Sequence, residues 1–314
     1  MTVPSSISAS VGESLVSVVV TTRNEEKNVE NCLKSIRAQT YQHIEAIVVD
    51  NSSTDRTREF ASRYADQVAV KGPERSAQRN YGMIDLAQGE YVMFVDADMI
   101  LSPGLIEACV RHMQAGECLA LHIREIVLGV NYWSKVRRFE RTFYDGTVID
   151  GARFFRKRAF VRVGGFDEKL FKEGSGEDWD IDKLIKRIGT IDLLDTSLVA
   201  DQSWSPDLIE FIRCRGVSPS LREPFIYHNE ADFDLFRYLK KKAYYAKGFD
   251  GYIAKWGRND PDIRKQFGVW YRYFVVFLEN GKWSILFAHP LLSMGMYSLR
   301  FLVGAVFILR KRPA

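Results

Sequence analysis

One stretch decides the fold, the sequence YVMFVDAD at residues 91–98. Five apolar or aromatic residues run directly into Asp96 and Asp98, which only Ala97 separates. A short, continuous apolar run is typical of a strand that is buried on both faces of a parallel sheet. Ligands of such sheets bind beyond the carboxyl ends of the strands, where the two aspartates fall. Because Mg²⁺ and Mn²⁺ prefer carboxylate oxygens, the stretch predicts a metal or nucleotide site.

The two aspartates could instead cap the helix that follows them. Ser102 and Pro103, however, already offer an N-cap and a first-turn proline for a helix that begins near Gly104. A second set of caps is rarely needed at one helix start, which favours the metal or nucleotide interpretation.

Length and composition set the outer limits. A chain of 314 residues has room for one domain of ordinary size and a smaller second part, and a hydrophobic fraction of 46% can form a core. The net charge of +4 is too small to indicate nucleic acid as a partner. The four cysteines show no C-x-x-C pair, so we expect neither a zinc centre nor a disulfide framework, and a reducing compartment fits.

Strand and helix patterns alternate through the first half of the chain. Strands are expected at residues 15–22, 44–50, 67–70 and 91–95, and helices between them, the third at 76–88. This alternation predicts a parallel, right-handed α/β sheet flanked by helices. No G-x-G-x-x-G follows the first strand and no Walker lysine motif is present, so a dinucleotide-binding dehydrogenase and a P-loop ATPase are poor fits.

Polar residues follow the first two strands. The sequence TTRNEE ends the first strand and DNSSTD ends the second. An ionised Asp50 could accept the imide N–H of a uracil ring, and Thr22 and Asn24 offer small polar groups for base and ribose. Each motif alone could be a helix cap, but three polar strand ends in one sheet converge on one crevice.

Four motifs in order carry a family resemblance. The sequences VVTTRNEE, VVDNSSTD, RNYG (residues 79–82) and FVDAD resemble a family 2 glycosyltransferase with the glycosyltransferase-A fold, over roughly residues 15–200. The resemblance implies transfer of a sugar from a nucleotide-diphosphate donor, expected to be a UDP-sugar, with Mn²⁺ or Mg²⁺ as the cofactor. It places Asp96 on ribose and metal and Asp98 on the metal. The remaining donor-binding residues that it implies are Thr22, Asn24, Glu25, Asp50, Ser52 and Arg79.

A second resemblance concerns the reaction. The segment GGFD at residues 164–167, followed by EDW at 177–179, resembles the acceptor region of inverting members of the family. It implies that Asp178 is the general base of a single displacement, with Glu177 as the alternative. His228 stands where a late metal ligand of the family would, although a lone histidine is more often a packed or solvated residue.

The C-terminal part changes in composition. Aromatic and basic residues interleave from residue 232, as in helices at membrane interfaces. Residues 283–309 are the most apolar stretch, interrupted at His289-Pro290 and at Arg300 into pieces shorter than the ~20 residues of a spanning helix. We therefore expect a re-entrant or interfacial association at the cytoplasmic face of a membrane, with a short hairpin or two core helices as alternatives. A membrane-presented acceptor, such as a polyprenyl-diphosphate-linked glycan, would follow.

The expected organisation has four parts: a disordered tail at residues 1–14, a catalytic domain at 15–205, an amphipathic extension at 206–282 and an apolar segment at 283–314. Three other functions stay open. A polyprenyl-phosphate sugar synthase needs no general base, so the Glu177–Asp178 pair counts against it. An aromatic and basic nucleic-acid binder conflicts with the carboxylates at the strand ends. A nucleotidyltransferase would release pyrophosphate instead of a nucleoside diphosphate.

Overall fold

A computed structural model describes residues 14–172, 175–198 and 203–310. The tail expected at residues 1–14 therefore lies outside the described residues except for Ser14, as does the end of the apolar segment at 311–314.

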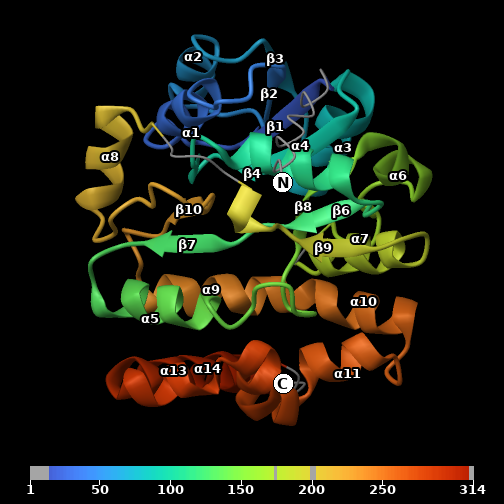
Figure 1. Ribbon diagram of the computed structural model, residues 1–314. Coiled ribbons are helices and arrows are strands. Elements are labelled where there is room, and N and C mark those ends of the chain that lie inside the picture. Colours follow the sequence, from blue (N-terminus) through green and yellow to red (C-terminus); the bar gives the residue numbers. More distant parts are fainter. Residues whose placement is uncertain (1–13, 173–174, 199–202, 311–314) are drawn as a thin grey trace, which may run out of the picture.

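A seven-stranded sheet forms the centre of the molecule, in the order β3-β2-β1-β4-β8-β6-β9 (Figure 1). The first four strands in this order are parallel, and β8 runs antiparallel to both of its neighbours. The mostly parallel α/β sheet predicted from the sequence is thus confirmed. The strands are β1 (Val16–Thr22), β2 (Ile44–Asp50), β3 (Gln67–Val70), β4 (Tyr91–Asp96), β6 (Ala120–His122), β8 (Ala152–Arg156) and β9 (Ile191–Leu193).

Helices cover both faces of this sheet because the central strands are apolar on both sides. Val18 and Val20 of β1 pack in one hydrophobic cluster with α1 and α4, whereas Val19 packs on the other face with η1, α6 and α7. This is the burial expected for strands inside a parallel sheet. The helical segments of the sheet domain are α1 (Val29–Arg37), α2 (Thr57–Ala61), α3 (Arg75–Asn80), η1 (Tyr81–Leu86), α4 (Leu105–Ala115), α6 (Lys157–Arg162), α7 (Glu177–Lys186) and η2 (Thr196–Leu198).

Ser102 does not cap α4, contrary to the expectation from the sequence. Gly104 occupies the N-cap position, and the Ser102 hydroxyl donates a hydrogen bond to the carbonyl of Phe225 at 2.6 Å. Ser102 therefore joins the end of β5 to the chain that leads into β10.

A second, three-stranded sheet has the order β5-β10-β7, with strands β5 (Met99–Leu101), β7 (Glu125–Leu128) and β10 (Ile226–Asn229). The β10 strand is antiparallel to β5 and parallel to β7. It lies beyond residue 205, where the sequence placed the end of the catalytic domain, and α8 (Pro206–Arg213) shares a core with Leu128 and Tyr227. The sheet structure therefore continues at least to residue 229.

Together with α5, the C-terminal helices form layers of helices beneath the sheets, which we call the helix floor (Figure 1). Here α14 packs along α5 and α9, and a cluster of buried aromatic and aliphatic side chains fills the space between the layers. The segments of this floor are α5 (Tyr132–Arg141), α9 (Leu235–Tyr245), η3 (Ala246–Gly248), α10 (Phe249–Trp256), α11 (Pro261–Phe267), η4 (Tyr271–Val275), α12 (Val276–Leu278), η5 (Glu279–Gly281), α13 (Trp283–Ala288) and α14 (Pro290–Arg310).

The break expected at His289-Pro290 separates α13 from α14, but the break expected at Arg300 is absent. Arg300 is 6% exposed and forms an ion pair with the buried Glu140 of α5 at 3.0 Å. The helix continues through Arg300 because arginine is a good helix former, and Glu140 compensates its charge. Pro290–Ile308 is consequently long and apolar enough to cross a membrane by length and composition, with a mean hydropathy of 1.7.

Candidate active site

The polar ends of β1, β2 and β4 meet at one edge of the sheet. Thr22 is in register with Asp50, and Thr21 with Asp96. Asp50 is fully buried and accepts hydrogen bonds from the Thr22 hydroxyl and from the Ser53 backbone N–H, both at 2.8 Å. Asp50 therefore ties the first two strand ends together from within, and its contact with a uracil ring stays a prediction.

The two loops that follow these strands are held in tight turns. Asn24 and Ser52 have positive φ angles of 55° and 51°, a conformation that asparagine tolerates better than most residues. The side chain of Asn24 accepts a hydrogen bond from the backbone N–H of Thr54 at 2.9 Å. The donor-binding residues expected on these loops thus lie together at the sheet edge.

Glu25 extends this edge toward the aspartates after β4. Burial raises its pKa, and the nearby charges of Asp98 and Asp96 raise it further. Three carboxylates thus share one region of the molecule, an arrangement that favours a bound cation.

Asp98 lies beside His228, and both are predicted metal ligands. The Nε2 atom of His228 is 3.3 Å from Oδ2 of Asp98, because the β5–β10 pairing aligns His228 with Met99. Burial opposes the charge on the imidazole, but Asp98 outweighs it and raises the pKa of His228 to about 9. The second oxygen of Asp98, Oδ1, is buried and has no hydrogen-bond partner. An orphaned carboxylate oxygen at this place fits a metal ligand.

Asp96 points instead toward arginines. Its Oδ1 accepts from Arg79 at 3.0 Å, and its Oδ2 lies 3.6 Å from Arg153. Desolvation opposes the ionised form of Asp96, but these two guanidinium groups lower its pKa well below the usual range. Asp96, Asp98 and His228 therefore lie in one region without their ligand atoms converging on a single point.

Arg79 connects this region to the start of α7. Its Nη1 is 3.0 Å from Asp178 and 3.6 Å from Glu177, and its guanidinium stacks on Phe94 at 4.0 Å. Arg79 is 2% exposed, so its fork is fixed between the carboxylates of β4 and α7. The two candidates for the base differ sharply, because the Asp178 side chain is 38% exposed and that of Glu177 only 1%.

Two glycines allow the start of α7 to reach this position. Gly176 at its N-cap has a φ of +125°, which favours glycine. A Cβ atom on Gly151 would lie 3.0 Å from the Cβ of Asp178, so the chain before β8 passes very close to the aspartate. Gly151 and Gly176 therefore allow Asp178 to lie at the start of α7 in this position.

Several residues of the site were missed by sequence reasoning. Arg153 of β8 donates to the buried Glu125 at 2.5 Å while its Nη1 faces Asp96, and Arg75 forms an ion pair with Glu177. The signal for Arg153 was a basic residue among apolar ones in a strand that also contains Arg156, and only the strand pairing could interpret it. Arg75 carried no signal, because it precedes a motif that begins at Arg79.

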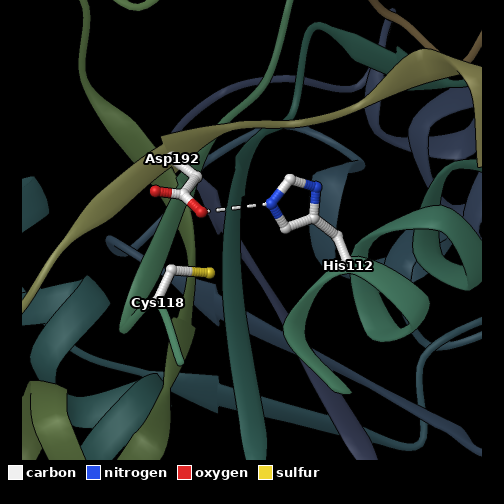
Figure 2. Close-up of side chains that lie close together, drawn as sticks. All are labelled: His112, Cys118 and Asp192. Carbon is white, nitrogen blue, oxygen red and sulfur yellow. Dashed lines mark hydrogen bonds and ion pairs between the residues drawn. The ribbon is translucent and has the colours of Figure 1, made fainter. Parts of the chain in front are cut away.

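A separate group of possible metal ligands was also unexpected. Among the residues that the structure describes, ligand atoms of His112, Cys118 and Asp192 lie within 4.8 Å of one another (Figure 2). Nδ1 of His112 accepts from the backbone N–H of Asp195 at 3.2 Å, so Nε2 carries the proton that faces Asp192. Burial and Asp192 raise the pKa of the Cys118 thiol to about 11. His112 Nε2 and the Cys118 thiol are both protonated in this arrangement, which fits a hydrogen-bonded contact between α4 and β9 better than a metal site.

Comparisons with known proteins all find glycosyltransferases. Residues 17–166 match the sequence model of glycosyl transferase family 2. The glycosyltransferase GlyG of Streptococcus pneumoniae is 35% identical over 126 residues, which are 38% of this chain and 40% of that protein. The chain spans less than half of the length of the first curated relatives that it matches.

Two solved structures share the fold at low identity. The mannosyltransferase PcManGT from Pyrobaculum calidifontis, in complex with GDP-Man and Mn²⁺, has a TM-score of 0.55 and 17% identity and covers 95% of this chain and 88% of its own. Residues 1–349 of TarS from S. aureus, in complex with UDP-GlcNAc, have a TM-score of 0.51 and 16% identity and cover 92% and 81%. The similarity therefore extends beyond the central sheet.

Proposed function

This chain carries a glycosyltransferase family 2 domain, and on that premise we propose that it transfers a sugar from a UDP-sugar to an acceptor hydroxyl with inversion. One observation carries the proposal: the Arg79 fork holds Asp96 and Asp178 at 3.0 Å each. The donor side and the base side of the reaction thus face the same space. Two solved structures of this fold support the proposal, because both contain a nucleotide sugar and one of them also contains Mn²⁺.

The donor would be held by the acidic edge of the sheet. Asp98 with its orphaned oxygen, Asp96 and His228 would hold Mn²⁺ or Mg²⁺, which supplies positive charge for the departing diphosphate. Arg79 and Arg153 add fixed guanidinium charges beside it. Glu25, Thr22, Asn24, Ser52 and Asp50 shape the loops around the nucleotide.

Asp178 takes the acceptor proton. As the hydroxyl oxygen attacks the anomeric carbon, its proton passes to the Asp178 carboxylate and the bond from that carbon to the diphosphate oxygen breaks. One base and one displacement give inversion. Arg79 orients Asp178 through a hydrogen bond, while the exposure of the aspartate leaves room for the acceptor. Glu177, buried and paired with Arg75 and Arg79, acts as support.

Two variants and a control test this assignment. Asp178→Asn should abolish transfer and keep UDP binding, whereas Asp98→Asn should lose metal-dependent UDP binding. Asp207→Asn, an exposed change on α8, should behave as wild type. A fully active Asp178→Asn enzyme would overturn the base assignment. Activity of that variant on a lipid phosphate would favour the polyprenyl-phosphate sugar synthase instead.

We also propose that the protein rests on a membrane through α13 and α14 and does not span it. The outward side chains of α14 recur on one helix face and are more than 60% exposed: Leu291, Met294, Phe301 and Ile308. The opposite face is packed, with Met296, Leu299 and Arg300 buried. The Tyr132 hydroxyl of α5 also donates to the Leu291 carbonyl at 2.8 Å. A helix attached along one side to the catalytic part and apolar on the other lies in the interface plane. The acceptor would then be membrane-presented, and the side of the membrane stays a prediction.

Chemical labelling distinguishes an α14 that lies in the interface plane from one that spans the bilayer. Full-length protein that carries Ala314→Cys is added to preformed vesicles and treated with a membrane-impermeant maleimide. The exposed Cys214 of the catalytic part serves as an internal reference. Labelling of both cysteines supports the in-plane arrangement, and protection of residue 314 alone would show that α14 crosses the bilayer.

A further inference from the structure

The α9 helix carries two lysines and two tyrosines on one face. Tyr238, Lys241, Lys242 and Tyr245 recur at the three- and four-residue spacing of one helix face. Tyr238 packs in the hydrophobic cluster with α5 and α14, whereas Lys241 is exposed and Lys242 half-buried, so this face runs from the interior to the surface. Lys240 is exposed as well and lies outside this spacing. Two lysines of the basic and aromatic stretch therefore lie beside Tyr245.

Three cations surround one aromatic ring at the end of α9. The Arg75 guanidinium carbon lies 5.1 Å from the centroid of the Tyr245 ring, and the Lys241 and Lys242 ammonium groups lie 5.5 Å from it. Arg75 also donates to the Tyr245 hydroxyl at 3.3 Å. We call Arg75, Lys241 and Lys242, together with Tyr245, the cation cluster.

The cluster has more positive than negative charge. Arg75 is paired with Glu177, but within the described residues no carboxylate forms an ion pair with Lys241 or Lys242. The nearest carboxylates of the helix floor are used by Arg137, which pairs with Glu140 at 2.6 Å and with Glu230 at 3.4 Å. Burial and the Arg137 guanidinium lower the pKa of Lys242 to about 7. An anion bound beside Tyr245 would offset the repulsion between these cations and favour the charged form of Lys242.

The cluster adjoins the proposed base. Arg75 contacts Glu177, the neighbour of Asp178, and the Tyr245 carbonyl accepts from the Ser175 N–H at 3.0 Å. On its other side α9 packs against α14, so α9 lies between the sheets and the apolar helix α14 (Figure 1). The cation cluster therefore lies beside the start of α7, which carries Asp178.

We propose that the cation cluster binds a phosphate group of the acceptor and holds it beside Asp178. This inference rests on the proposed glycosyl transfer and adds the chemical class of the acceptor, a phosphate ester. Three donors on separate side chains suit a phosphate, which offers several acceptor oxygens. The phosphate could belong to a lipid or to a soluble ester, and both share this chemistry.

The test measures phosphate binding while the donor site is filled. Full-length protein saturated with UDP and Mg²⁺ is titrated calorimetrically with inorganic phosphate, then with phosphatidylcholine vesicles with and without phosphatidic acid. Lys241→Ala/Lys242→Ala should weaken phosphate binding by about tenfold or more, the loss of at least one charged contact. Lys240→Ala is the matched control and should stay within about twofold of wild type. Thermal unfolding of each variant checks the fold.

The outcomes separate this inference from the proposed function. Equal phosphate affinity in the double variant and wild type would overturn the inference, as would phosphate that binds only when UDP is absent, because it would then occupy the donor site. UDP binding without phosphate binding removes the inference alone, and absence of UDP binding removes the proposed function. Binding of free phosphate supports a soluble ester or a lipid equally. Tighter binding to phosphatidic acid vesicles that depends on Lys241 and Lys242 identifies the lipid source.

Discussion

Replacing Arg79 by lysine tests whether the guanidinium fork itself is needed. Arg79 reaches Asp96 with Nη2 and Asp178 with Nη1, each at 3.0 Å. A lysine keeps the positive charge, but its single ammonium group cannot make both contacts in the same geometry. Arg79→Lys therefore tests whether the orientation of the two aspartates matters in addition to the positive charge between them.

The size of the effect follows from the contact that is lost. A hydrogen bond to a charged group is worth about 1.5–3 kcal/mol, or roughly a 10- to 150-fold change in rate if it acts in the transition state. The side chains of Asp96 and Asp178 are 33% and 38% exposed, so water replaces part of the lost contact. We therefore expect the lower end, a fall of about tenfold in kcat/KM.

The assay compares transfer with donor binding. The kcat/KM of Arg79→Lys should fall while its affinity for UDP changes by less than about threefold, because the charge near the diphosphate persists. Arg63→Lys is the matched control, since Arg63 makes an exposed ion pair with Glu59 at 2.7 Å. A kcat/KM of Arg79→Lys within twofold of wild type would refute the idea that the fork aligns the base with the donor side.

Three further results are expected. Gly82→Ala would place a Cβ 2.3 Å from Cγ1 of the buried Val19, so its unfolding free energy in urea should fall by about 1–3 kcal/mol, whereas Gly116→Ala, with 3.6 Å to its nearest atom, should change little. Burial disfavours the charged form of His122, but Asp182 at 2.7 Å outweighs burial and raises its pKa. This pair therefore adds stability that is fully present below about pH 6.5 and is lost as the pH rises through the folded pKa, and Asp182→Asn should remove that part of the pH dependence of urea unfolding. Treatment with EDTA should abolish transfer and added Mn²⁺ should restore it, and full activity in EDTA would count against the metal assignment.

The sheet was predictable because short local sequence patterns specify its strands. Continuous apolar runs predicted strands at 44–50 and 67–70, and β2 (Ile44–Asp50) and β3 (Gln67–Val70) have those bounds. The helix predicted at 76–88 is less regular, since α3 passes into the π-helix η1 where Gly82 packs directly against Val19. Such close packing depends on the opposite strand, which the local sequence does not contain.

The contacts between distant segments were not predictable. Residues 119–128 contain two strands in different sheets, β6 and β7, because the partners of these strands come from elsewhere in the chain. Arg153 faces Asp96 only through the antiparallel pairing of β8 with β4, and Arg75 meets Tyr245 across 170 residues. The motifs thus indicated the candidate side chains, whereas their contacts with Arg153 and Arg75 depend on the tertiary fold.

The reversed direction of β8 determines which connections lie near Asp178. In a parallel strand the loop after the strand reaches the ligand edge, but β8 meets that edge with its first residues, at Gly151 and Arg153. Changes of length or composition in residues 142–150 would therefore alter the surroundings of Asp178 and leave the loops after β1 and β2 untouched. If the proposed function holds, separate connections would serve the two substrates, so that acceptor choice could diverge between related enzymes while donor choice is kept.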